Sequence, residues 1–143
     1  MNRVYNNEAI MMLCIVRLLQ DGSMNIAKLL LCMVLAIDDR LNPIVRNAYS
    51  LDNILAELRK EHSLTRKFIS YSPYFINALI MLRQLDCLGK AGDTLYVTNT
   101  MLNENVRTRS RRMARIFTAS DNLRRFFGSI EVDEIYNKLA IQL

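Results

Sequence analysis

Apolar positions near the start of the chain predict two strongly hydrophobic helices. The first covers residues 7–20 and is apolar around most of its circumference. The second covers residues 24–38, where Ser23 can act as its N-terminal cap, and it is apolar on all sides from Leu29 to Ile37. A helix that is apolar on most sides belongs in the centre of a core or at a subunit interface.

These two helices carry more apolar surface than a chain of 143 residues is expected to cover by itself. The later segments are not obviously apolar enough to bury both helices completely. We therefore expect part of their surface to meet another chain. The candidate interface residues are Ile10, Leu13, Leu30, Met33 and Val34.

The middle of the chain alternates short amphipathic helices with turn signals. Helices are expected over residues 51–61 and 64–70, and a further helix that ends near residue 85 is predicted to start at Ser72-Pro73. Residues 86–98 fit two short strands around a Gly-containing turn. The fold class is therefore mostly α with a small β-hairpin, a winged-helix-like helical domain. The alternative is a helical bundle with an incidental hairpin.

The C-terminal part of the chain predicts three more helices. They cover residues 101–117, residues 120–127 with Ser120 as cap, and a last segment capped by Ser129. We divide the chain into residues 1–98, the apolar helices plus the winged-helix-like core, and residues 99–143, the Arg-rich C-terminal helices. The second part is either in the same compact domain or a packed extension of it.

The positive charge of the chain is concentrated in residues 107–125. The whole chain has a formal net charge of +5, whereas this window alone holds seven arginines and one acid, Asp121, for a net charge of +6. The rest of the chain is therefore slightly acidic. The candidate contact residues are the seven arginines of this window, Arg107, Arg109, Arg111, Arg112, Arg115, Arg124 and Arg125.

Three interpretations of this arginine window stay open. Guanidinium groups bind phosphate and carboxylate in bidentate fashion, so the window could contact a DNA backbone or an acidic partner protein. A merely solvated helix face is the third interpretation. It is disfavoured because Arg107, Arg111 and Arg115 recur every four residues, and like charges at this spacing repel each other.

The winged-helix interpretation argues against an ordinary sequence-specific repressor. Its recognition helix is the segment 72–85, which offers a single cation, Arg83. The hairpin offers Lys90 against Asp86 and Asp93. Sequence-specific DNA readers of this type place several cations on that element. A protein-docking role suits this sequence better.

The sequence contains no pattern that indicates an enzyme or a metal centre. His62 is the only imidazole, and the Asp38-Asp39 pair has no acidic partner motif at a recognisable spacing. Gly89-Lys90 lacks the upstream glycine of a phosphate-binding loop. We expect no catalytic residue, no cofactor and no metal ligand.

The cysteines and the apolar runs indicate an intracellular protein. Cys14, Cys32 and Cys87 each lie beside aliphatic residues, which is typical of buried free thiols in a reducing cytoplasm. The longest apolar run, residues 29–37, is shorter than the about 20 residues that a membrane span needs. The earlier apolar run, residues 9–16, follows Asn6, Asn7 and Glu8 and not a cationic segment, so we expect no signal peptide. A cytoplasmic protein without a membrane segment is expected.

Three sequence features resemble one family. They are the start Tyr5-Asn6-Asn7-Glu8-Ala9-Ile10 leading into an apolar helix, the second apolar helix over residues 29–37, and a helix ending in Leu85-x-x-Leu88-Gly89 before a hairpin. This order resembles the middle components of bacterial three-component ABC ATPase conflict systems, which include the small subunit of Lamassu-type antiphage defence systems. Many of those components have proline where this chain has Glu8, and the similarity covers most of residues 5–98.

The resemblance implies a non-catalytic subunit. Such a subunit sits with an SMC-like ABC ATPase, whose heads carry the nucleotide chemistry, and with an effector that is often a nuclease. It helps to hold the effector inactive until foreign DNA is sensed, and it contacts the DNA backbone through the complex if at all. The alternative is a stand-alone winged-helix DNA-binding transcriptional regulator that acts as a dimer.

Overall fold

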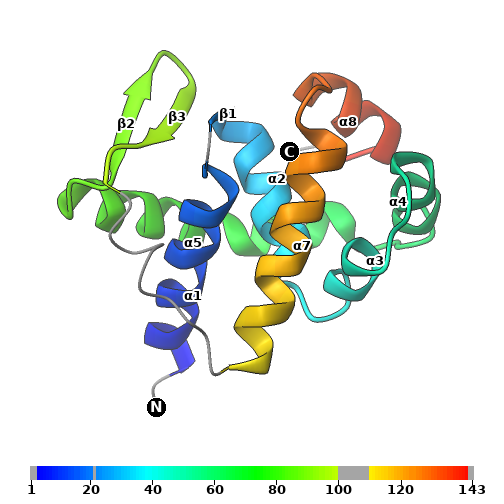
Figure 1. The fold of residues 1–143 in the computed structure, drawn as a ribbon. Coiled ribbons are helices and arrows are strands. Elements are labelled where there is room, and N and C mark those ends of the chain that lie inside the picture. The colour runs from blue at the N-terminus through cyan, green and yellow to red at the C-terminus, as the bar shows by residue number, and fades with distance from the viewer. Residues whose placement is uncertain (1–2, 21, 100–109, 142–143) are drawn as a thin grey trace.

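The computed structural model describes residues 3–20, 22–99 and 110–141 and confirms a mostly helical fold with a small antiparallel sheet (Figure 1). The elements in chain order are α1 (Arg3–Leu18), β1 (Ser23–Asn25), α2 (Ile26–Ile37), α3 (Asn42–Arg46), α4 (Leu51–Leu58), α5 (Leu64–Gln84), β2 (Leu88–Ala91), β3 (Thr94–Val97), α7 (Arg111–Phe127) and α8 (Val132–Leu139).

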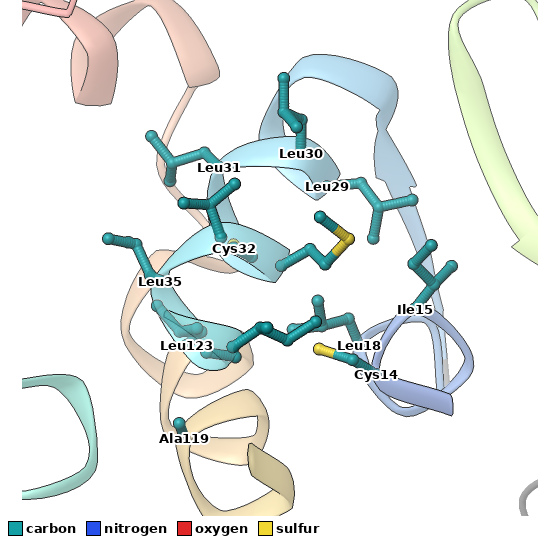
Figure 2. Close-up of a cluster of buried hydrophobic side chains, with 14 of the residues drawn as sticks. Cys14, Ile15, Leu18, Leu29, Leu30, Leu31, Cys32, Leu35, Ala119 and Leu123 are labelled. Atoms are coloured by element: carbon teal, nitrogen blue, oxygen red, sulfur yellow. The ribbon is translucent and has the colours of Figure 1, made fainter. Parts of the chain in front are cut away.

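Helix α2 forms the centre of the core, as its uniform apolar sequence requires. Every residue from Lys28 to Ile37 is buried. Helices α1, α5 and α7 pack around it. Figure 2 shows Leu29 and Leu35 of α2 facing Ile15 of α1 and Leu123 of α7. Burial of each such side chain stabilises the fold by about 1.5–3 kcal/mol.

The sheet has the strand order β1-β3-β2, with both pairs antiparallel. The hairpin of β2 and β3 confirms the prediction for residues 86–98, and its turn contains Gly92 at φ 64°, a conformation that favours glycine. It projects from the helical body (Figure 1). Strand β1 is an addition to the predicted elements. The element order, with β1 after the first helix and the hairpin after α5, is compatible with a winged-helix layout.

The cap of α2 is Asn25, not Ser23 as expected. The Asn25 side-chain oxygen accepts hydrogen bonds from the backbone N–H groups of Ala27 and Lys28 at 2.8 and 3.3 Å. Its amide nitrogen donates to Asp93 at 2.8 Å in the hairpin turn. Ser23 is instead drawn into β1, where it pairs with Tyr96. The start of the central helix is thus tied directly to the hairpin.

Helix α5 is one continuous helix, which corrects the two helices predicted for this segment. Pro73 lies inside it and does not begin a new helix. Phe68 before the proline and Phe75 after it are both buried on the same side, so packing holds the two halves in register. Pro73 has no N–H, so the carbonyl of Ile69 lacks its usual helical donor. Both residues lie on the exposed side of the helix.

Helix α7 is likewise uninterrupted, so Ser120 does not cap a separate helix. Ser120 is buried in the middle of α7, where its hydroxyl donates to the carbonyl of Ile116 at 2.8 Å. The residues 101–109 of the predicted helix lie outside the described part of the chain. Gly128 ends α7 as expected. Helix α8 then begins at Val132, with Glu131 and not Ser129 at the cap position.

Helix α7 joins the C-terminal part of the chain to the N-terminal core. It lies between α1 and α3 (Figure 1). Its Met113, Ile116 and Leu123 belong to the same buried cluster as α2. Helix α3 begins at Asn42-Pro43, a dipeptide that by itself indicates only a turn. It is joined to α7 by the Asn42 amide, which donates to the Arg115 carbonyl at 3.3 Å.

Candidate functional site

Helix α5 carries most of the exposed apolar surface of the described residues. Six of the eight large apolar side chains that are exposed lie on α5 or at its C-terminal cap. We call these six residues the α5 face; they are Ile69, Tyr74, Ile76, Ile80, Met81 and Leu85. Ile76 and Ile80 are 54% and 49% exposed. No charged residue occurs between Lys67 and Arg83, so the face is uncharged along most of the helix.

Two pockets adjoin the α5 face on the side of the sheet. Both are lined by Ile76 of α5 and Ile26 of α2, and their volumes are about 330 and 360 Å³. The larger pocket is lined mainly by aliphatic side chains from α5, β2 and β3. Arg83 and Lys90 also line it. The α5 face is therefore bordered by an apolar groove with two cations at its edge.

The position of α5 before the hairpin is that of the recognition helix of a winged helix. Its surface differs from that of a DNA reader. Of the cations on α5, Lys67 is held by an ion pair to Asp38 at 3.1 Å, which leaves Arg66 and Arg83 near the two ends of the helix. The exposed middle of α5 is apolar, a composition that favours contact with protein.

The interface expected on the two N-terminal helices is absent from α2. Leu30 is 8% exposed, and Met33 and Val34 are completely buried within this single chain. The expectation that these residues leave apolar surface for a partner is wrong, because α1, α5 and α7 together cover α2. Ile10 and Leu13 of α1 are partly buried and pack against the core.

The described arginines of the window 107–125 do not form one patch. Arg107 and Arg109 lie outside the described residues. Arg111, Arg112 and Arg115 lie at the N-terminal end of α7, and Arg124 and Arg125 in its last turn. Arg125 follows Arg111 by fourteen positions, a rise of about 21 Å along the helix axis. The two groups therefore contact different surroundings.

The arginines at the C-terminal end of α7 are engaged within the fold. Arg124 donates to Asp121 at 2.6 Å and to the carbonyl of Gln20 at 3.0 Å. The guanidinium of Arg125 lies 4.5 Å from the centre of the Phe126 ring. Both cations also lie where the helix dipole is negative. Their charges have a structural explanation.

The arginines at the N-terminal end of α7 border a pocket. Arg112 and Arg115 line a space of about 360 Å³ between α7 and the segment that joins α2 to α3. Arg46 at the end of α3 lines the same pocket. Arg46 cannot be identified from the sequence, because nothing in the local pattern indicates that α3 packs against α7.

A further pocket, of about 530 Å³, has cations that are engaged by protein oxygens. It is lined by Lys28 and Arg124 together with the carboxylate of Glu131. Lys28 donates to the carbonyl of Gly128 at 3.3 Å, and Arg124 is held by Asp121. The Nε atom of Arg124 is buried without a hydrogen-bond partner in the described part of the chain, but its terminal nitrogens donate to Asp121 and Gln20.

Asp38, the first residue of the acidic pair Asp38-Asp39, is the C-terminal cap of α2. Asp38 is buried and accepts hydrogen bonds from the backbone N–H groups of Arg40 and Leu41. It also accepts from Lys67 and from the Tyr71 hydroxyl, at 3.1 and 3.2 Å. Burial, followed by the charge of Asp38, raises the pKa of Tyr71. Asp38 thereby joins the end of α2 to α5.

Other chemistry-bearing side chains are also accounted for by the fold. Among the described residues, no group of three or more His, Cys, Asp or Glu side chains could hold a metal ion. Cys14 and Cys32 are completely buried, and burial raises the pKa of each thiol to about 12. Gly89 lies in β2 beneath the ring of Tyr96, where an added Cβ would collide with that ring.

No helix in the described part of the chain combines the length and the apolar character that crossing a membrane requires.

Comparisons with protein-family models, with curated proteins and with solved structures found no match to this chain.

Proposed function

We propose that this chain is a non-catalytic accessory subunit that docks onto a larger protein through the α5 face. The observation that carries the proposal is the exposed, uncharged apolar surface of α5, next to a groove lined by aliphatic side chains. Exposed apolar side chains gathered on one helix beside an apolar groove are typical of protein-protein interaction sites. The face occupies the winged-helix element that DNA readers fill with cations.

The partner that the sequence resemblance implies is an SMC-like ABC ATPase of a three-component antiphage defence system. In this proposal the subunit bridges the ATPase and a nuclease-type effector in the cytoplasm. The groove beside the α5 face binds an amphipathic helix of the ATPase. The apolar row of that helix enters the groove beside Ile76 and Ile80. Acidic residues next to that row would face Arg83 and Lys90, which line the groove.

The test is co-purification of this chain with the ATPase encoded beside it. The double variant Ile76→Asp with Ile80→Asp places two charges on the α5 face and is expected to reduce co-purification about tenfold or more. Both side chains are half exposed, so the variant is expected to keep its circular dichroism spectrum and its melting temperature within a few degrees.

The matched control is Tyr49→Asp. Tyr49 is 81% exposed and lies between α3 and α4, away from the α5 face. It is expected to co-purify like the wild type. Equal co-purification of the α5 double variant and the wild type contradicts docking through α5. The absence of a coiled-coil ATPase gene next to this one contradicts the choice of partner.

The second candidate function is a stand-alone winged-helix DNA-binding regulator, which the element order favours. The apolar middle of α5 counts against it, because base readout in the major groove needs polar and cationic side chains. Fluorescence anisotropy with a pool of random duplexes distinguishes the two. A regulator selects a sequence from the pool, and this selection is lost when Arg83→Ala is introduced.

A further inference from the structure

The pocket between α3 and α7 is strongly cationic. Arg46 of α3 and Arg112 and Arg115 of α7 line it, against one carboxylate, that of Asp39. The lining therefore carries a net charge of +2. Its apolar walls include Ile37 and Ile116, which reduce the dielectric screening around these charges.

Two of these arginines present buried donors that nothing in the described structure accepts. The Nε atoms of Arg46 and Arg112 are both shielded from solvent and lack a hydrogen-bond partner among the described residues. A buried N–H without an acceptor is costly, and native structures usually supply a ligand, ion or water at such a group. The two arginines that carry these donors line the same pocket.

The polar groups already present in the pocket do not satisfy these donors. Asp39 forms no ion pair with Arg46 or Arg112 within the described residues, and its side chain is exposed to solvent. The Asn42 amide nitrogen is committed to the carbonyls of Ala36 and Arg115 at 2.6 and 3.3 Å. By contrast, Arg17 elsewhere on the fold donates two hydrogen bonds to Asp121.

We infer that this pocket binds a phosphate group. A guanidinium presents Nε–H and a terminal N–H as two parallel donors, which match two oxygens of one phosphate. Two arginines engaged in this way satisfy both buried Nε atoms, and Arg115 adds a third cation. A carboxylate offers only two oxygens and cannot accept from three such groups equally well.

The phosphate could come from a nucleic-acid backbone or from a free phosphate compound. Arg111 lies one turn before Arg115 on the exposed side of α7, so a chain of phosphates could continue from the pocket along this row. This inference does not rest on docking through the α5 face, because the pocket is built from other elements. Either proposal can fail while the other stands.

The test measures binding of pyrophosphate and of a short duplex DNA to the full chain at constant ionic strength. Pyrophosphate is expected to raise the melting temperature, since a ligand of the native state stabilises it. The double variant Arg46→Gln with Arg112→Gln is expected to weaken pyrophosphate binding about tenfold or more. Circular dichroism checks whether the double variant is folded. If it is unfolded, Arg115→Gln is used in its place, since the Arg115 side chain is exposed.

The matched control is Arg111→Gln. It removes the same charge from the same turn of α7, but Arg111 does not line the pocket. It is expected to leave pyrophosphate binding within about twofold of the wild type. If DNA binding also depends on Arg46 and Arg112, the pocket takes a backbone phosphate; if only pyrophosphate binding does, it takes a free one. Absence of pyrophosphate binding, or equal losses of pyrophosphate binding in the pocket variant and in Arg111→Gln, overturns the inference.

Discussion

The guanidinium of Arg17 donates two hydrogen bonds to Asp121, both at 2.9 Å, and thereby joins α1 to α7 across 104 positions of sequence. Arg124 donates a third hydrogen bond to the same carboxylate. Burial by itself would raise the pKa of Asp121, but the hydrogen bonds from the two arginines outweigh burial and lower the pKa. The acid counted within the arginine window is thus a structural tie between helices.

Replacement of Asp121 by Asn is expected to lower the free energy of unfolding near pH 7 by about 1 kcal/mol, since the pair is partly exposed. The lowered pKa fixes the sign of the pH dependence. The stability that Asp121 contributes is fully present above its unfolded-state pKa of about 3.9 and is lost as the pH falls through the lower folded-state value. Urea unfolding at several pH values measures both effects.

The control for this experiment is Asp133→Asn, which removes an exposed carboxylate in the first turn of α8. Its effect is expected to stay within about 0.5 kcal/mol, apart from a small helix-dipole contribution. If the stability difference between Asp121→Asn and the wild type does not shrink in acid, the ion pair is not its cause.

Replacement of Met33 by Ala is expected to destabilise the chain by about 2–5 kcal/mol, because Met33 is fully buried at the centre of α2. A residue of a subunit interface would instead leave the isolated chain nearly as stable as before and weaken only the complex. Chemical denaturation of the isolated chain, followed by circular dichroism, separates these outcomes. A loss below about 0.5 kcal/mol contradicts the buried placement.

The thiols of Cys14 and Cys32 are expected to resist alkylation in the folded protein. Both are inaccessible, and burial raises the pKa of each to about 12, so almost no thiolate exists near pH 8. Iodoacetamide labelling followed by peptide mass mapping measures the reaction. The same reaction in denaturant is expected to label both residues, and rapid labelling without denaturant contradicts the packing of α1 on α2.

Replacement of Pro73 by Ala is expected to raise the free energy of unfolding by about 1–2 kcal/mol. Proline in a helix interior costs about 3 kcal/mol, and the greater freedom of alanine in the unfolded chain offsets part of the gain. The comparison is Pro43→Ala at the start of α3, where proline suits the first turn and its loss is expected to destabilise slightly. A lower free energy of unfolding for Pro73→Ala than for the wild type contradicts this prediction.

Local patterns predicted the helices whose apolar stripe and caps agree, and failed where distant packing decides. Ser50, directly before the predicted helix 51–61, caps α4, with its side-chain oxygen accepting from the backbone N–H of Asn53. Ser120 carries the same local signal, yet it lies inside α7, where its hydroxyl donates to the carbonyl of Ile116 and is buried against Cys14 of α1. Strand β1 has only three residues, and its pairing with β3 lies far along the chain, so no window of sequence reveals it.

The candidate sites were predictable to different degrees. Arg112 and Arg115 are visible as part of an arginine cluster, whereas Arg46 joins them only because α3 packs on α7. The absence of charge between Lys67 and Arg83 is visible in the sequence, but it does not say which side of the helix faces outward. Phe75 and Ile76 are adjacent and apolar, yet one is buried and the other is exposed.

The pairing of β1 with β3 has a consequence for how the molecule assembles. An isolated two-stranded hairpin is only marginally stable in water, so the hairpin depends on its third strand. That strand is supplied from the boundary of α1 and α2, and Asn25 and Asp93, which meet there, are 68 positions apart. Contacts of such separation form slowly because a long loop must close first. The hairpin is therefore expected to order late in folding, and a fragment beginning at α5 is expected to lose it.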